Sequence, residues 1–244
     1  FKQVIPNGEV HTPYGATESL PVTTISGKRI LEETMQKTNQ GAGTCVGRPF
    51  PGMTVEIIRI RDGIISNIQD AEPLVRGEIG ELIVKGPVVT KAYDQMELAT
   101  SKAKIFDGNF VWHRMGDAGY MDEEGNLWFC GRVAERVQTK DGVLFTDPVE
   151  AYFNQQAHVF RSALIGLGEA PNQIPAIVIE PEKDHWTDDY NDHRNWEKEL
   201  LDNIHSESPA SRVEKVFFHK DFPVDVRHNA KIHRLALAKV FGGG

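Results

Sequence analysis

The chain has 244 residues, enough for one large domain or two modest ones, and its composition, 40% hydrophobic and 25% charged, is that of a globular protein. Its net charge of −8, with acidic residues spread along the chain, argues against a general nucleic-acid or anionic-membrane binder. No apolar run approaches the roughly 20 residues that span a bilayer, so no transmembrane segment is expected.

The two cysteines and the first residues of the chain indicate in which cellular compartment the protein is expected. Cys45 and Cys130 lie far apart and in no motif, so they are expected to be buried apolar residues of a reducing, cytoplasmic protein. The start has no signal-peptide form and no initiator methionine, which suggests a chain that begins inside a longer protein.

The first half of the chain predicts short strands and turns, which suggest a small barrel or sandwich. The expected elements are a strand and loop at 8–15, a helix at 28–38, strands at 54–60 and 77–86, a helix at 95–105, strands at 110–113 and 127–130, and turns at Gly116–Asp117 and Asp122–Asn126.

After Arg132 helices and strands alternate, so the fold class is α+β with a domain boundary near that residue. A helix at 147–157 is expected to begin with Asp147 as its N-cap and Pro148 at its first position. The remaining expected elements are strands at 159–166, 174–179 and 214–219 and a helix at 192–206.

Residues 14–18 carry the strongest chemical signal, Tyr14-Gly15-Ala16-Thr17-Glu18. A tyrosine ring can stack on a nucleobase, and a glycine lets the backbone approach a ligand closely. A threonine hydroxyl can bind a phosphate oxygen, and a glutamate carboxylate can hold Mg²⁺. Taken alone, the pentapeptide also fits the end of a strand followed by a turn.

Three further residues are candidate ligands. Asp117 could accept hydrogen bonds from both ribose hydroxyls, and Arg132 could bind the same hydroxyls or a phosphate. Lys231 could place a mobile positive charge on a carboxylate and a phosphate together. Each residue taken alone also has a simple structural interpretation: Asp117 as an aspartate in a turn, Arg132 as a surface arginine and Lys231 as part of a basic tail.

In their order and spacing, these segments resemble the motifs of the adenylate-forming superfamily, which includes acyl-CoA synthetases, luciferases and peptide-synthetase adenylation domains. Its Gly-x-Pro-x-Pro-Gly and Gly-Glu-x-Gly-Glu motifs are matched at residues 46–52 and 77–82. The resemblance implies that residues 1–131 are the β-rich, barrel-like C-terminal part of a large AMP-binding domain. Residues 132–244 would then be a small, mobile C-terminal lid domain.

The resemblance also implies ATP and Mg²⁺ as cofactors, and a role for each matched residue. The implied roles are Tyr14 and Gly15 at the adenosine, Thr17 on the α-phosphate, Glu18 on Mg²⁺, Asp117 and Arg132 on the ribose, and Lys231 as the catalytic lysine acting with Thr17 and Glu18.

The chain departs from the superfamily pattern in two places: the phosphate-binding loop and the hinge between the two domains. The glycine-rich phosphate loop precedes the motifs found here, and Gly41-Ala42-Gly43 follows a helix and lacks the lysine needed to replace it. The chain is therefore expected to be a fragment that does not catalyse adenylation by itself. The hinge position is Ala134, a small residue that can absorb a change in backbone angles.

Two other departures concern the substrate. In residues 138–150 the glycine of the CoA-ligase motif is displaced and its first glutamate is absent, which argues against CoA. Residues 12–21 and 222–231 resemble the olefin-biosynthesis branch, whose members are β-lactone synthetases of long-chain 2-alkyl-3-hydroxy acids. An internal 3-hydroxyl needs no CoA tunnel and reacts with a high effective molarity.

Two alternatives stay open: a long-chain acyl-CoA or acyl-carrier ligase, and a non-catalytic binding module that resembles an adenylation domain. The implied partners are a 3-hydroxy acid and an olefin-pathway assembly, without nucleic acid.

His113 and His228 are expected to be structural. The acidic run 184–192 is expected to be a solvated loop, and no histidine spacing indicates a zinc site.

Overall fold

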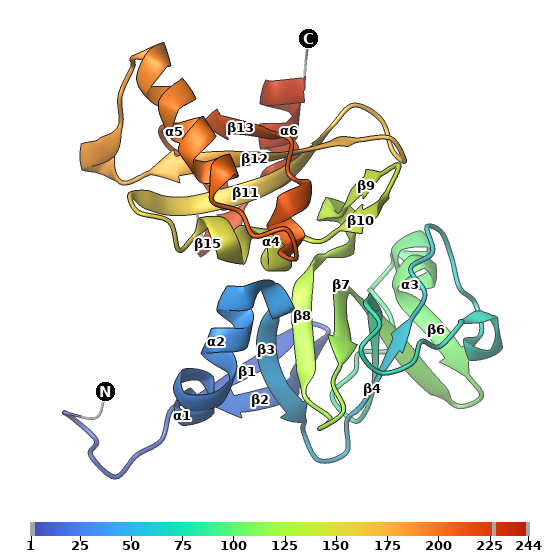
Figure 1. Ribbon diagram of the computed structural model, residues 1–244. Helices are drawn as coiled ribbons and strands as arrows, with labels where there is room; N and C mark the ends of the chain where they lie inside the picture. The colour runs from blue at the N-terminus through green and yellow to red at the C-terminus, as the bar shows by residue number, and fades with distance from the viewer. Residues whose placement is uncertain (1–2, 226–227, 243–244) are drawn as a thin grey trace. The chain divides into compact units, whose positions relative to one another are not determined.

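The computed structural model describes residues 3–225 and 228–242, which form two compact units (Figure 1). Within these ranges, the first unit comprises residues up to Lys37 together with Gly43–Val133, and the second comprises Thr38–Ala42 and the residues from Ala134 onward. None of the described helices is long and apolar enough to cross a membrane. Each unit is considered by itself below.

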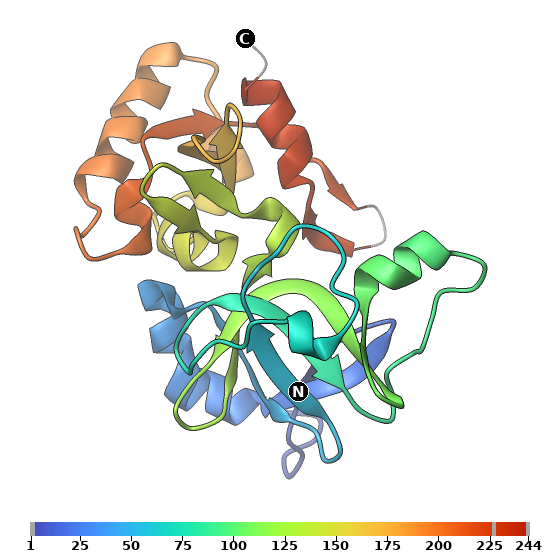
Figure 2. The same ribbon diagram turned by 90° about the vertical axis from the view of Figure 1, so that its right-hand side faces the viewer.

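The described strands of the first unit form one eight-stranded antiparallel sheet. In spatial order the strands are β1 (His11–Ala16), β2 (Ser19–Ser26), β3 (Thr44–Pro49), β8 (Leu127–Arg132), β7 (Phe110–Met121), β5 (Gly80–Lys85) and β4 (Thr54–Ile58), with β6 (Lys104–Asp107) also paired to β7. The sheet bends at β3, whose end pairs with β2 while its beginning pairs with β8. Figure 2 shows this curvature.

Both faces of the β4–β5 pair are covered, which explains why these strands are so apolar. Ile57 and Leu82 belong to one buried cluster, whereas their neighbours Ile58 and Ile83 belong to another on the opposite face. Cys45 and Cys130 are buried in β3 and β8, so the expectation that both cysteines are buried is confirmed.

The helical segments of the first unit lie between its strands. They are α1 (Gly27–Arg29), η1 (Ile30–Thr34), α2 (Met35–Lys37), α3 (Glu97–Ala103) and η3 (Ile68–Asp70). The helix expected at 28–38 starts after Ser26, whose hydroxyl accepts a hydrogen bond from Arg29 N as an N-cap. It continues through η2 (Thr38–Ala42), a segment that belongs to the second unit.

The turn expected at Gly116–Asp117 is wrong, because β7 runs through both residues as one long strand. Gly116 has a φ of +67°, a left-handed conformation that glycine adopts readily and that is typical of turns. Here it is accommodated inside the strand, close to a register irregularity between Ala118 and Gly119.

The turn expected at Asp122–Asn126 is confirmed, and it connects β7 to β8.

The second unit is built on a three-stranded sheet, so the expected α+β class is confirmed. Its strands are β11 (Val159–Leu167), β12 (Ile174–Pro181) and β13 (Lys215–Phe218), with β12 parallel to β13. Its other elements are η4 (Val133–Glu135), which begins at the boundary, β9 (Val137–Thr139), β10 (Gly142–Leu144), α4 (Thr146–Phe153), η5 (Lys183–His185), α5 (Tyr190–Asp202), η6 (Pro209–Arg212), β14 (Val224–Asp225), β15 (His228–Ile232) and α6 (Arg234–Gly242).

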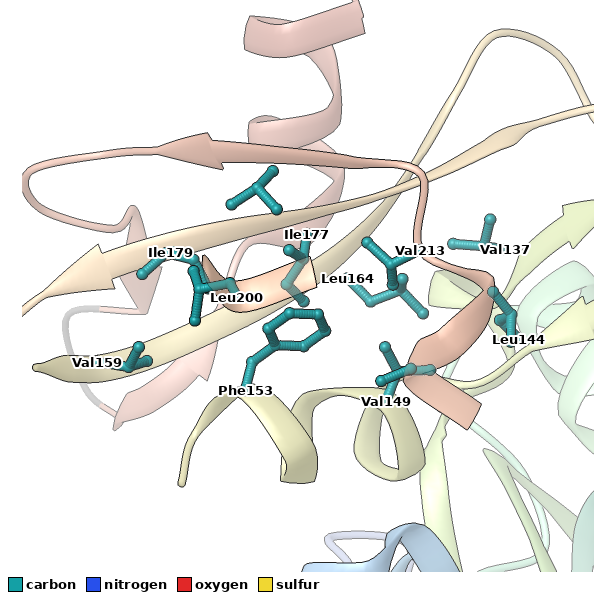
Figure 3. Packing of buried hydrophobic residues seen from close by; sticks show 12 residues of the cluster. Val137, Leu144, Val149, Phe153, Val159, Leu164, Ile177, Ile179, Leu200 and Val213 are labelled. Carbon is teal, nitrogen blue, oxygen red and sulfur yellow. The ribbon is translucent and has the colours of Figure 1, made fainter. Parts of the chain in front are cut away.

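Alternating residues of β11 and β12 bury both faces of this sheet. Leu164 and Ile177 pack on one face with Phe153 of α4 and Leu200 of α5, as Figure 3 shows. On the opposite face, the apolar side chains pack with Leu237 of α6. The unit is therefore a helix–sheet–helix arrangement with one apolar cluster on each face of the sheet.

Helix α4 begins one residue earlier than the sequence suggests. Phe145 occupies the N-cap position without a side-chain cap, and Asp147 lies inside the first turn, so the expected N-cap at Asp147 is wrong. An acidic residue in the first turn still interacts favourably with the helix dipole.

Arg234 connects three elements of the second unit. Its Nε and Nη2 donate to the two carboxylate oxygens of Glu150 at 2.7 and 2.6 Å, and its Nη1 donates to Glu135 at 3.1 Å. Glu150 also accepts a hydrogen bond from Leu164 N at 2.8 Å. Burial lowers the pKa of Arg234, but Glu150 and Glu135 outweigh it and raise that pKa above its usual value. Residue Arg234 thereby anchors the start of α6, three positions after Lys231.

We predict that Arg234→Ala lowers the unfolding free energy of this unit by about 3–5 kcal/mol, because Glu150 would keep a buried, unpaired charge. Urea denaturation followed by tryptophan fluorescence measures the change. Arg194→Ala, which truncates an exposed arginine of the same unit, should stay within about 0.5 kcal/mol of wild type. Equal effects of the two substitutions would contradict the prediction.

Candidate functional site

Tyr14, Asp117 and Arg132 come together in the first unit. The β7–β8 hairpin places Asp117 directly opposite Arg132 in the strand register. Arg132 Nη1 donates to Asp117 Oδ1 at 2.6 Å, and the Tyr14 hydroxyl donates to Asp117 Oδ2 at 2.5 Å. Two residues that stand fifteen positions apart in the sequence thus form a cross-strand ion pair, joined by an aromatic residue from β1.

The carboxylate at the centre of this cluster is buried, but the arginine is accessible. Asp117 is 5% exposed, whereas the side chain of Arg132 is 54% exposed. Burial raises the pKa of Asp117, and the neighbouring Arg132 and Tyr14 act in the opposite direction. Burial, followed by the charge of Asp117, raises the pKa of the Tyr14 phenol well above its usual value, so the phenol remains a hydrogen-bond donor. The cluster can present oriented oxygens and a guanidinium to a polar ligand.

Thr17 and Glu18 form the two-residue turn between β1 and β2, since Ala16 pairs with Ser19. A side chain at Gly15 would place its Cβ 2.4 Å from Ser19 O, so this hairpin requires glycine there. Thr17 is exposed and Glu18 is half-buried. The pentapeptide is therefore a strand end and turn that also projects a hydroxyl and a carboxylate, and the two interpretations of the sequence are compatible.

Glu18 lies in a polar cluster that the sequence did not indicate. The Tyr93 hydroxyl donates to Glu18 Oε1 at 2.7 Å, and Thr90 N donates to Glu18 O at 2.9 Å. The Tyr93 hydrogen bond lowers the pKa of Glu18 despite partial burial, and burial with the Glu18 contact raises the pKa of Tyr93 to about 12. Glu18 is thus held as an anion, the form that binds a divalent cation.

Lys104 places a buried ammonium group in the same cluster. It is 1% exposed, its Nζ donates to Thr90 Oγ1 at 3.1 Å, and it lies 5.8 Å from the centre of the Tyr93 ring. Burial lowers the pKa of Lys104, and the charge of Glu18 opposes this effect. A buried cation close to a carboxylate favours the ionised state of that carboxylate.

His113 is the neutral member of this cluster. It is 3% exposed, and burial, followed by the charge of Lys104, lowers its pKa from 6.5 to about 4. Its Nδ1 lies 3.2 Å from Ala103 O, and because a carbonyl can only accept, Nδ1 carries the hydrogen. These contacts support the structural role expected for His113.

We predict that His113 makes the unfolding free energy fall as the pH is lowered from about 7 to 4. The unfolded histidine takes up a proton near pH 6.5, whereas the buried one does not until about pH 4, so stability is lost on acidification. At about 1.4 kcal/mol per pKa unit, the difference amounts to about 3 kcal/mol.

Urea unfolding at several pH values tests this dependence. His113→Gln should flatten the curve between pH 7 and 4.5, and the matched change at exposed His11 should leave it unchanged. Parallel curves for His113→Gln and wild type would show that the buried imidazole is not responsible.

Lys231 lies in the second unit, exposed on β15, which pairs with β14. Val226 and Arg227 of the same C-terminal motif lie outside the described residues. The side chains of residues 228–230, including that of His228, are also outside them. Among the expected site residues, the structure therefore groups Tyr14, Asp117 and Arg132 in the first unit, with Thr17 and Glu18 on the hairpin that contains Tyr14.

Comparisons with known proteins identify relatives of this chain. Residues 1–94 match the family of AMP-binding enzymes. The olefin beta-lactone synthetases of Stenotrophomonas maltophilia and Xanthomonas campestris are 43% and 42% identical to this chain over 93% of its length. The chain spans 41% of each of these relatives, about two fifths.

The fold has counterparts among solved structures. The O-succinylbenzoate coenzyme A synthetase of Bacillus subtilis, in complex with ATP and magnesium ion, superposes with a TM-score of 0.67 and 23% identity. The superposition covers 94% of this chain and 41% of that one. The resemblance indicated by the motifs is therefore confirmed: this chain is related to the adenylate-forming, AMP-binding enzymes.

Proposed function

We propose that this chain is part of an ATP-dependent enzyme that activates a carboxylate as an acyl-adenylate. The observation that carries the proposal is the assembly of Tyr14, Asp117 and Arg132 around one buried carboxylate. Each carboxylate oxygen of Asp117 already accepts one hydrogen bond and has a second lone pair available for a ribose hydroxyl. The exposed guanidinium of Arg132 can bind the same ribose, and the Tyr14 ring can lie against the adenine.

Thr17 and Glu18 suit the phosphates and the cation. The exposed hydroxyl of Thr17 can donate to the α-phosphate, and Gly15 allows the tight hairpin that presents it. Glu18 would hold Mg²⁺ through its carboxylate, together with oxygens of the ATP phosphates. The Tyr93 hydrogen bond fixes the orientation of this carboxylate. Bound Mg²⁺ would neutralise charge on the phosphates during transfer.

Lys231 is the proposed catalytic lysine. In the first step a carboxylate oxygen of the substrate attacks the α-phosphorus and pyrophosphate leaves. The ammonium of Lys231 would stabilise the negative charge that develops on the oxygens of both groups. Residues 132–244 would form the lid domain that carries this lysine, and residues 1–131 would belong to the large AMP-binding domain.

The proposed substrate is a long-chain 2-alkyl-3-hydroxy acid. In the second step its 3-hydroxyl oxygen attacks the acyl carbon and loses its proton, AMP leaves, and a β-lactone closes. The identity to two olefin beta-lactone synthetases over most of this chain supports the assignment. The altered motif at residues 138–150 supports it as well, since an internal nucleophile replaces CoA. We further propose a cytoplasmic enzyme working beside other olefin-forming enzymes.

We predict that Asp117→Ala weakens ATP binding by about tenfold or more, because two charge-assisted hydrogen bonds to the ribose would be lost. Isothermal titration with ATP and Mg²⁺, on protein expressed from the full open reading frame, measures the affinity. Asp94→Ala, at an exposed aspartate of the same unit, should bind ATP as wild type does. Unchanged affinity in a folded Asp117→Ala protein would refute the ribose role.

The reaction itself is tested with the same full-length protein, ATP, Mg²⁺ and a synthetic 2-alkyl-3-hydroxy acid, without CoA. We expect a β-lactone and an equal amount of AMP, with products identified by NMR at low temperature because β-lactones lose CO₂ on heating. Lys231→Ala should reduce AMP formation by at least about a hundredfold with the fold intact. Lys239→Ala, another exposed lysine of the second unit, should be fully active.

Other outcomes separate the alternatives. A thioester product that forms only after CoA is added would make the protein an acyl-CoA ligase and our interpretation of residues 138–150 wrong. Absence of both ATP binding and pyrophosphate release would favour the non-catalytic binding module.

A further inference from the structure

Two histidines and one glutamate of the second unit converge on one point, although none has a part in the function proposed above. His158 precedes β11, Glu182 follows β12, and His185 ends η5. Their nearest ligand atoms all lie within 4.8 Å of one another. The sequence shows no zinc-type spacing because the first histidine stands far from the other two residues along the chain.

The backbone fixes the positions of these residues. Val159 pairs with Pro181 at the end of the β11–β12 ladder, and Glu182 N donates to His158 O at 2.9 Å just beyond it. His185 N donates to Glu182 O at 2.9 Å, which closes the short helical turn. Three side chains that could bind one ion are therefore held by ordered backbone hydrogen bonds.

The distances approach those of a metal site. His158 Nδ1 and His185 Nδ1 each lie 3.7 Å from Glu182 Oε2. With metal–ligand bonds of about 2.0–2.1 Å, the ligand atoms of a tetrahedral zinc site are about 3.3 Å apart. Each histidine–glutamate pair would therefore have to close by a few tenths of an ångström, and the three ligand atoms, now within 4.8 Å of one another, would have to converge to this spacing to share one ion.

The two imidazole rings are stacked, with centroids 3.5 Å apart and planes 18° from parallel. A metal lies in the plane of each imidazole that binds it, so the rings must rotate apart to share one ion. Both side chains can rotate, since they are 51% and 37% exposed. His185 Nδ1 also lies 3.2 Å from Asp184 Oδ1, a contact that the metal would replace.

Two further observations concern the surroundings of these three residues. His158 has a φ of +65°, an uncommon conformation outside glycine that sets the direction of its side chain. His158 and His185 also line a cavity of about 470 Å³, together with Trp196 and Leu200. The cavity leaves space for water or a small anion as the fourth ligand.

We propose that His158, Glu182 and His185 form a binding site for a divalent transition metal of the zinc class. Two imidazole nitrogens and one carboxylate oxygen are the donors that such ions prefer, and three protein ligands leave one position open. Coordination through Nδ1 leaves the imidazole hydrogen on Nε2 of each ring. The ion would connect the end of the β11–β12 ladder to η5 and stabilise this unit.

Titration of the untagged chain with ZnCl₂, by calorimetry and by thermal unfolding, tests the site. We expect one ion bound and a melting temperature that rises with zinc concentration. His158→Ala, Glu182→Gln and His185→Ala should each weaken binding at least about tenfold and remove the thermal shift. Replacement by Co²⁺ should give the strong visible absorption of a tetrahedral site.

His205→Ala is the matched control, an exposed histidine of the same unit outside the cluster, and it should bind zinc as wild type does. The proposal is wrong if wild type shows no saturable binding, or if the three variants bind Zn²⁺ as tightly as wild type does. Circular dichroism of each variant separates a lost site from a lost fold.

Discussion

The candidate site of the first unit depends on the β7–β8 hairpin, which holds a buried carboxylate opposite an arginine. A buried, ionised carboxylate is costly unless it is paired and hydrogen-bonded. Arg132 supplies the charge from the neighbouring strand, and Tyr14 supplies a hydroxyl from β1. The contacts that stabilise Asp117 also orient its two oxygens, so the same interactions that stabilise the fold prepare the proposed ribose-binding group.

Local patterns were sufficient to predict most elements. Alternation in a β-rich run identified β4, and glycines at both ends identified the segment that contains β5. Apolar runs identified β11 and β12, because these strands bury both faces of a sheet. The Gly116–Asp117 turn was wrong because a positive φ satisfies a glycine inside a strand as well as in a turn. The motif order also identified Tyr14, Asp117 and Arg132 as candidate site residues, and the structure brings these three side chains together.

Other contacts were beyond any local pattern. Tyr93 and Lys104 reach Glu18 and Thr90 through the folding of the sheet, and a single tyrosine or lysine gives no sign of such a partner. Arg234 and Glu150 lie far apart along the chain, and their pairing depends on where α6 starts relative to α4. The histidines beside Glu182 are brought together by strand register, which sequence spacing does not encode.

The second unit is not a continuous stretch of sequence, because it includes Thr38–Ala42. Within this unit, the amide of Gln155 donates to Asn39 O at 2.7 Å, and a Cβ at Gly41 would lie 2.9 Å from Pro148 O. Recombination between the genes of two relatives at the Val133–Ala134 boundary would replace α4. The Thr38–Ala42 segment that packs against α4 would still come from the original protein. A second unit taken from another family member must therefore fit a five-residue segment that it does not bring with it. That segment is encoded almost a hundred codons upstream of the boundary.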